Sequence, residues 1–177
     1  MIYPIVVTQF SKILRNLLAI LDKAAVHAQA KKYDMAVLLQ ARLAPDQFNL
    51  LQQVQVACDT AKLGAARLAN QEQSAPSHPD TEQTLAEITA RIQSVIAYLA
   101  TFSAADFVIA EERRITQPRW KGKSLSGEEF LTQHAAPNLY FHVTTAYAIL
   151  RHNGVEVGKK DFLGELPYKD QRGEPCN

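Results

Sequence analysis

Apolar residues recur along the chain mainly at spacings of three and four positions, the period of an amphipathic helix. The first such stretch covers about residues 5–30 and follows Pro4, a residue suited to the first turn of a helix. After a short turn, a second stretch covers residues 44–69, with Asp46 as the predicted N-cap. The two apolar stripes are Phe10, Ile13, Leu14, Leu17, Leu21, Ala24 and Ala28, then Leu51, Val54, Cys58, Ala61, Ala65 and Leu68.

The polar, proline-containing segment 70–79 predicts a linker before the third helix. Asp80 ends this segment, and Gln83 three positions later predicts a capping box. The third helix has its apolar stripe at Leu85, Ile88, Ile92, Val95, Leu99 and Phe102. The charged residues predicted on its outer side are Glu82, Glu87 and Arg91.

The helical period breaks between residues 104 and 125, where RRITQPRWKGKSL mixes β-branched and turn residues and predicts a short β-hairpin. A last helical pattern starts at GEEFLTQHA, is bent or restarted at Pro137, and ends at Asn153-Gly154, a left-handed stop. Residues 155–177 are predicted to form an extended tail. Four long amphipathic helices in one domain, residues 1–177, predict an all-α four-helix bundle.

Composition narrows the classes of partner. Lys and Arg (19) nearly balance Asp and Glu (18), giving a net charge of +1. A charge this small does not favour nucleic acid as a binding partner. Cys58 and Cys176 form neither a zinc spacing nor a disulfide framework, so we expect a reducing cytoplasm. The N-terminal MIYPIVVTQF has no positive region, and no window approaches about 18 uninterrupted apolar residues. We therefore expect neither a signal peptide nor a membrane span.

One face of the last helix carries polar residues among apolar neighbours. At 100° per residue, Asn138, His142, Thr145 and His152 lie within about 40° of one direction. His142 and His152 are about 15 Å apart along the axis, so they cannot bind one ion together. His142 is either a core histidine bonded to another helix or part of a reactive site. His152, near the helix C-terminus, is explained by the helix dipole.

The second helix has a polar row of its own, formed by Gln52, Gln55, Asp59 and Lys62. The row is either a solvated face or a set of inward groups. An inward Asp59 would need a partner such as His142 or Lys62. A carboxylate–imidazole pair would be an acid/base candidate or an ordinary buried contact.

A basic cluster lies in the predicted hairpin, around Trp120. It is either a solvated surface or a site for an anionic ligand, and Glu111 and Glu112 reduce its charge. No HExxH, GxSxG, GxGxxG or P-loop pattern is present. The basic residues are Arg113, Arg114, Arg119, Lys121 and Lys123.

Two stretches, ARLAPDQFNLLQQVQVACDTAK and APNLYFHVTTAYAILRHNGVEVGKKDFLG, resemble a bacterial family of domains of unknown function. That family belongs to the DinB/YfiT-like superfamily of metalloenzymes, and the similarity runs from residue 3 to about 166. The resemblance implies a bundle of up-down-down-up topology whose long crossover matches residues 70–79. It also implies a homodimer, which Tyr140 and Tyr147, outside the inward stripe of the last helix, favour.

The resemblance further implies where a divalent metal, zinc or nickel, would be bound. DinB-like proteins use one histidine from the second helix and an i, i+4 histidine pair on the last. His142 matches the later member of that pair and Asn138 the earlier, while Gln52 or Gln55 falls near the remaining ligand. Because neutral amides are weak ligands, we predict a polar pocket without a tightly held transition metal. His142 and Asp59 are its catalytic candidates, and its other residues are Asn138, Gln52, Gln55, Thr145 and His152.

Three functions from different classes follow. The resemblance implies a thiol-dependent transferase or hydrolase with His142 as base or remaining ligand. The alternative is a non-catalytic module that binds a small molecule or forms a dimeric interaction surface. A DNA-associated role has no support in the charges.

Overall fold

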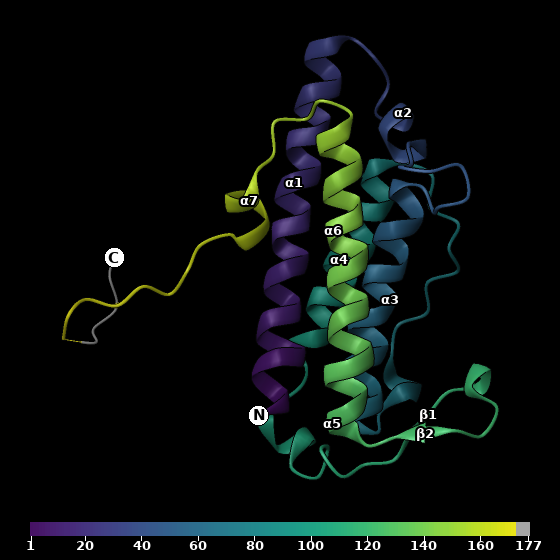
Figure 1. Cartoon of the computed structure of the whole chain (residues 1–177), viewed down its shortest axis with the longest axis vertical. Helices are drawn as coiled ribbons and strands as arrows, with labels where there is room; N and C mark the ends of the chain where they lie inside the picture. The colour runs from purple at the N-terminus through teal and green to yellow at the C-terminus, as the bar shows by residue number, and fades with distance from the viewer. Residues whose placement is uncertain (173–177) are drawn as a thin grey trace.

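The computed structural model of the protein describes residues 1–172. Four long helices form a bundle: α1 (Phe10–Lys31), α3 (Leu50–Ala69), α4 (Leu85–Leu99) and α6 (Ala136–His152) (Figure 1). Helices α1 and α6 run in one direction, while α3 and α4 run in the other. The predicted all-α bundle of up-down-down-up topology is confirmed.

Helix α1 is a core helix. It continues a π-helical turn, Pro4–Gln9, and together Pro4–Lys31 is long and apolar enough to cross a membrane by length and composition alone. Half of its apolar window is buried in the protein, and α1 contacts α4, α6 and α7. This burial accounts for its hydropathy.

The start of α3 differs from the prediction. Asp46 does not cap it; Asn49 does, because the Asn49 side chain accepts from the backbone N–H of Gln52 and the Gln52 side chain accepts from that of Asn49. Between α1 and α3 the predicted turn contains a short helix, α2 (Met35–Gln40).

The start of α4 also differs. Thr84 and Glu87 form the capping box, not Asp80 and Gln83. Asp80 has a left-handed backbone (φ 57°), which an N-cap residue does not adopt. The linker is therefore longer than predicted: residues 70–84, including the 3-10 turn Glu72–Ser74, return the chain along the bundle (Figure 1).

The predicted hairpin is present at the end of the bundle. Strand β1 (Ile115–Thr116) pairs antiparallel with β2 (Ser124–Leu125). A 3-10 turn, Pro118–Trp120, lies between them, and another, Ala104–Phe107, precedes β1. The hairpin projects sideways from the base of α3 and α6 (Figure 1).

The last helical region begins after the hairpin, where Ser126 caps α5 (Gly127–Phe130). A π-helical turn, Leu131–Ala135, joins α5 to α6. Pro137 has no backbone N–H to donate, and the wider turn before it accommodates the missing hydrogen bond. The helix ends as predicted, with Gly154 left-handed (φ 87°).

The tail after α6 is not wholly extended. It forms α7 (Lys159–Leu163), which packs on α1. The Asn16 side-chain amide donates to the Phe162 carbonyl at 2.9 Å, and Lys23 pairs with Asp161 at 2.6 Å. Residues 173–177, including Cys176, lie outside the described part of the chain.

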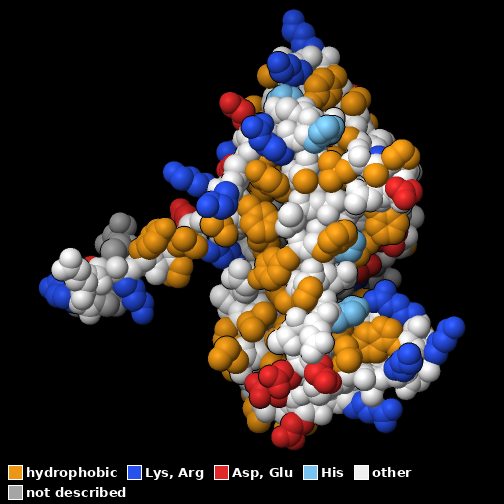
Figure 2. Space-filling model, viewed as in Figure 1, with side chains coloured by type: hydrophobic (Ala, Val, Ile, Leu, Met, Phe, Trp, Pro, Cys, Tyr) orange, Lys and Arg blue, Asp and Glu red, His pale blue; other side chains and the backbone are white. Residues whose placement is uncertain are grey.

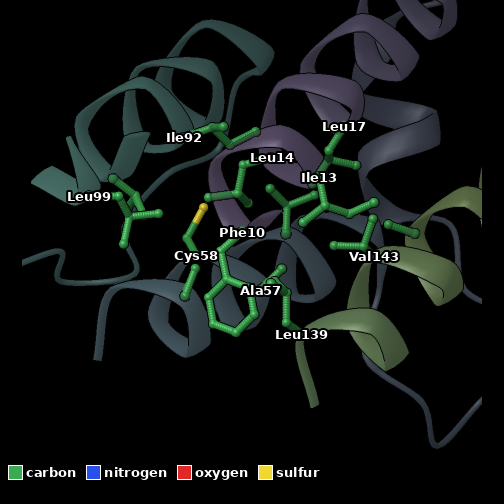
Figure 3. Close-up of a cluster of buried hydrophobic side chains, with 14 of the residues drawn as sticks. Phe10, Ile13, Leu14, Leu17, Ala57, Cys58, Ile92, Leu99, Leu139 and Val143 are labelled. Atoms are coloured by element: carbon green, nitrogen blue, oxygen red, sulfur yellow. The ribbon is translucent and has the colours of Figure 1, made fainter. Parts of the chain in front are cut away.

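The core lies where all four long helices meet (Figure 3). Helix α1 contributes a row of fully buried side chains, and α3 meets it with the small residues Ala57 and Cys58. Helix α3 itself packs mainly on α6 and α4, so Ala57 and Cys58 face α1 across the core. The other labelled core residues are Phe10, Ile13, Leu14, Leu17, Ile92, Leu99, Leu139 and Val143.

Candidate functional site

Helix α3 is the most enclosed of the four. None of its residues, Leu50–Ala69, is fully exposed, because α6 and α4 pack on either side of it. A narrow strip of half-buried residues still reaches solvent at spacings of three and four. We call this strip the α3 groove: Gln52, Val56, Asp59, Thr60, Leu63 and Arg67.

A cavity of about 430 Å³ occupies the upper part of the groove, between α3 and residues 80–83 of the linker. We call it the linker cavity. Its walls carry three carboxylates and several amides, so it is rich in hydrogen-bonding groups. The polar residues that line it are Gln40, Asn49, Gln52, Gln55, Asp59, Asp80, Glu82 and Gln83.

Arg91 of α4 lies beneath this cavity with its side chain 1% exposed. Its guanidinium contacts Asp59 at 2.9 Å, Glu82 at 3.1 Å and Asp80, and it donates to the Gln55 carbonyl at 3.3 Å. Burial alone would lower the pKa of Arg91, but the carboxylates outweigh burial and raise it. The prediction that Arg91 lies on the outer side of its helix was wrong. The buried Arg91 side chain connects the linker to α3 through these contacts.

Glu82 is held as a carboxylate. Burial alone would raise its pKa, but hydrogen bonds from Gln55 (2.9 Å) and Arg91 bring that pKa below its ordinary value. Glu82 therefore presents a negative charge to the cavity at neutral pH.

A second cation supports Asp59 from within the bundle. Lys62, 6% exposed, pairs with Asp59 at 2.9 Å and donates to His78 Nδ1 at 3.0 Å. His78 is then left to donate from Nε2 to the Ser94 hydroxyl at 3.2 Å. Burial and the charges of Lys62 and Arg91 lower the pKa of His78. The neutral His78 of the linker is thus hydrogen-bonded to Ser94 of α4.

Cys58 lies next to this cluster but is not a nucleophile. Burial raises the pKa of its thiol to about 12, so the reactive thiolate is not populated at neutral pH.

His142 meets α3 at Gln53, not at the residues proposed from sequence. Its Nδ1 lies 2.7 Å from the Gln53 side-chain oxygen, so Nδ1–H is the donor and Nε2 the free lone pair. Burial lowers the pKa of His142, which keeps the ring neutral at pH 7. Within residues 1–172, Nε2 has no hydrogen-bond partner.

Asn138 also faces α3, where its amide donates to the Thr60 hydroxyl at 2.8 Å. Gln53 and Thr60 are seven positions apart, so they lie about 20° apart on the α6-facing side of α3. Gln55 lies about 160° from Gln53 and turns to the linker instead. Helix geometry therefore separates the two sets of residues.

The single pocket expected from sequence is divided by this geometry. Asp59 pairs with Lys62 and Arg91, so no Asp59–His142 acid/base pair forms. Gln52 belongs to the α3 capping box. Thr145 donates to a carbonyl of its own helix, and His152 is exposed at the end of α6.

Several functional residues were missed from sequence alone, but two had a signal. Gln53 shares a face with Thr60 at the i, i+7 spacing. Arg91 lies three positions from Ile88 and four from Val95, within the buried stripe of α4. Nothing in the sequence indicated that the linker would supply its partners.

A second cavity, of about 230 Å³, lies lower in the groove, between α3, the start of α6 and the hairpin. We call it the hairpin cavity. Asp59 and Val56 line both cavities. The other residues of the hairpin cavity are Thr60, Leu63, Arg67, Gln117, Pro118, Arg119 and Asn138.

The side chains around His142 do not suit a zinc or nickel ion. Its nearest polar partner is the Gln53 amide, and Asn138 stands one turn away, so imidazole is joined only by weak neutral ligands. Across the described chain, no three His, Cys, Asp or Glu side chains are grouped to hold a metal.

The bundle, its long crossover and the polar α3–α6 contacts define a DinB-like helical protein. The chain belongs to the family described as "Domain of unknown function (DUF1993)", whose model matches residues 2–163. It is similar to a DinB family member protein from Shewanella denitrificans whose crystal structure is known. The two sequences are 63% identical and the two structures superpose with a TM-score of 0.93, over 96% of this chain and 95% of that one. Among curated proteins, none matches.

Proposed function

We propose that the protein binds a small polar molecule in the linker cavity and that this binding, not metal-dependent catalysis, is its function. The observation that carries the proposal is a cavity of about 430 Å³ walled by carboxylates and amides on an otherwise enclosed helix. Small-molecule sites are concave, with a few convergent polar groups.

The charges around the cavity favour a ligand with a cationic, hydrogen-bond-donating group. Three carboxylates, Asp59, Asp80 and Glu82, face two cations, Arg91 and Lys62, which leaves one negative charge in excess. The two cations are almost fully buried, whereas the carboxylates line the cavity. An amine or guanidinium would complete the charge balance and donate to the free lone pairs.

A thermal-shift screen with a panel of small amines and of carboxylates tests this proposal. An amine that binds should raise the Tm, since ligand at 100 times its Kd stabilises a protein by about 2.7 kcal/mol. Glu82→Gln should abolish that shift, while Asp46→Asn, at an exposed carboxylate outside the cavity, should keep it. Equal responses from both variants would refute binding at this cavity.

The second candidate is an enzyme, a thiol-dependent transferase or hydrolase. A single observation favours it: His142 is neutral and its Nε2 is unpaired within residues 1–172, as a general base requires. Turnover of a low-molecular-weight thiol with an electrophile, lost in His142→Gln, would support it. Elemental analysis of protein purified without an affinity tag would test the expectation of no zinc or nickel.

We also propose a homodimer that uses the outer face of α6. Phe141 is 56% exposed there, and Tyr140 next to it is half-buried. Tyr147 is also half-buried, on the side of α6 where its ring meets Phe162 of α7. Apolar side chains follow the bundle surface on this side (Figure 2). Light scattering should give twice the monomer mass, and Phe141→Glu should reduce it. A monomeric wild-type protein at tens of micromolar would contradict the proposal.

A cytoplasmic location, with neither membrane nor nucleic acid as partner, completes the proposal. The buried Cys58 thiol is free, as is usual in reducing compartments. Fractionation of cells that produce the protein should recover it with the cytosol.

A further inference from the structure

The hairpin cavity has a chemistry opposite to that of the linker cavity. Two guanidinium groups line it: Arg67 from α3 and Arg119 from the turn of the hairpin. Lys and Arg side chains also gather around the hairpin on the molecular surface (Figure 2).

Neither guanidinium is fully occupied. Arg67 uses Nε for Glu72 at 2.9 Å, and Glu72 is 54% exposed, which leaves both terminal nitrogens of Arg67 without a partner in residues 1–172. Arg119 contacts no carboxylate in that range. Its Nη2 instead donates to His134 Nε2 at 2.8 Å.

His134 holds Arg119 in place. Its ring stacks on Phe130 at 5.3 Å and meets Trp120 edge-on at 5.4 Å. Burial and the charges of Arg119 and Arg67 lower the pKa of His134, so the ring accepts the arginine hydrogen bond as a neutral base. Both arginines line the same small cavity.

Neutral donors complete the cavity wall. Gln117 is 6% exposed, and its Nε2 has no hydrogen-bond partner in the described chain. Thr60 accepts from Asn138, so its own O–H is free to donate. A buried donor without an acceptor is unfavourable, and an acceptor brought by a ligand would satisfy it. Asp59, the carboxylate that lines this cavity, is already paired with Lys62 and Arg91.

We propose that the hairpin cavity binds an oxyanion, the sulfate-, phosphate- or carboxylate-type group of a small molecule. Arg119 and Arg67 supply the charge, and Gln117 and Thr60 supply neutral donors. The volume of about 230 Å³ suits such a group with only a few further atoms. The two cavities share Val56 and Asp59 in their walls, but the hairpin cavity takes its positive charge from Arg67 and Arg119 and favours the opposite ligand chemistry.

The His134 ring reports on binding by NMR. Sulfate and acetate are each titrated at constant ionic strength, with sodium chloride as the balancing salt. Binding should move the His134 ring signals saturably and raise the pH midpoint of its titration, because the anion offsets the two arginine charges. Response to sulfate alone assigns a tetrahedral oxyanion, and response to acetate assigns a carboxylate.

Matched variants separate a built site from a basic surface. Arg119→Met should weaken binding by about tenfold or more through loss of a charge-assisted hydrogen bond. Arg114→Met removes the same charge from the same hairpin, but Arg114 bonds Ser124 and does not line the cavity, so binding should persist.

Gln117→Glu is a second test that leaves both arginines in place, in case Arg119→Met perturbs the hairpin. It keeps the side-chain shape, and its negative charge should abolish binding of the anion by repulsion. Circular dichroism confirms that each variant is folded. A linear response in the wild type, or equal losses in Arg119→Met and Arg114→Met, would overturn the proposal.

Discussion

Arg91 is the residue whose loss should reveal most about how this bundle holds its linker. The substitution Arg91→Met keeps most of the side-chain volume and removes the guanidinium. It leaves Glu82, Asp59 and Asp80 without the cation that all three contact. The Gln55 carbonyl also loses a donor.

The size of the loss in stability depends on how well water can replace the guanidinium of Arg91 as a partner of the three carboxylates. Removing one partner of a buried ion pair destabilises a protein by about 3–5 kcal/mol. Asp80 is 56% exposed and Asp59 34% exposed, so solvent screens part of the loss, whereas Glu82 is 11% exposed and is not rescued. We therefore expect the lower end, about 3 kcal/mol, and a fall in Tm of about 6–12 °C.

Urea unfolding followed by circular dichroism measures the change. Arg15→Met is the matched control, because Arg15 is exposed on α1, and its effect should stay within about 0.5 kcal/mol. Adding Glu82→Gln to Arg91→Met should restore about 1–2 kcal/mol, since it removes the uncompensated charge. Equal midpoints for the two arginine variants would refute the reasoning that Arg91 secures the linker.

Two further predictions concern backbone packing and pH. Gly127→Ala should lower the free energy of unfolding by about 2 kcal/mol or more, because a Cβ there would lie 1.7 Å from the Ala110 carbonyl oxygen. Gly64→Ala should instead raise it by about 0.5–1 kcal/mol, since the nearest atoms to a new Cβ are at 3.5 Å; urea unfolding distinguishes the two signs. His78 has a folded pKa below its ordinary 6.5, through burial and Lys62, so above that pH it contributes no pH dependence. As pH falls below 6.5 the unfolded chain takes up a proton that the folded chain resists, and stability declines. His78→Gln should decline less between about pH 7 and pH 5, and parallel curves for the two proteins would contradict the assignment.

The sequence by itself determined the four long helices through their periodicity, and it determined the hairpin and the helix stop at Gly154 through turn residues. Helical stripes are local, since residues three and four apart share a face whatever the helix packs against. The sequence determined the N-cap residues of α3 and α4 less well. Asp46 and Asp80 are as good caps by type as Asn49 and Thr84, and only the path of the chain before each helix decided between them.

The tertiary structure alone decided the partners of the polar residues. His142 required a partner on α3, but Gln52, Gln53 and Gln55 are chemically the same, and the rotation of α3 against α6 selected Gln53. Arg91 is buried because the linker, which bears no periodic signal, brings carboxylates to it from outside its helix. A buried charge depends on what surrounds it in three dimensions, and a one-dimensional pattern does not carry that information.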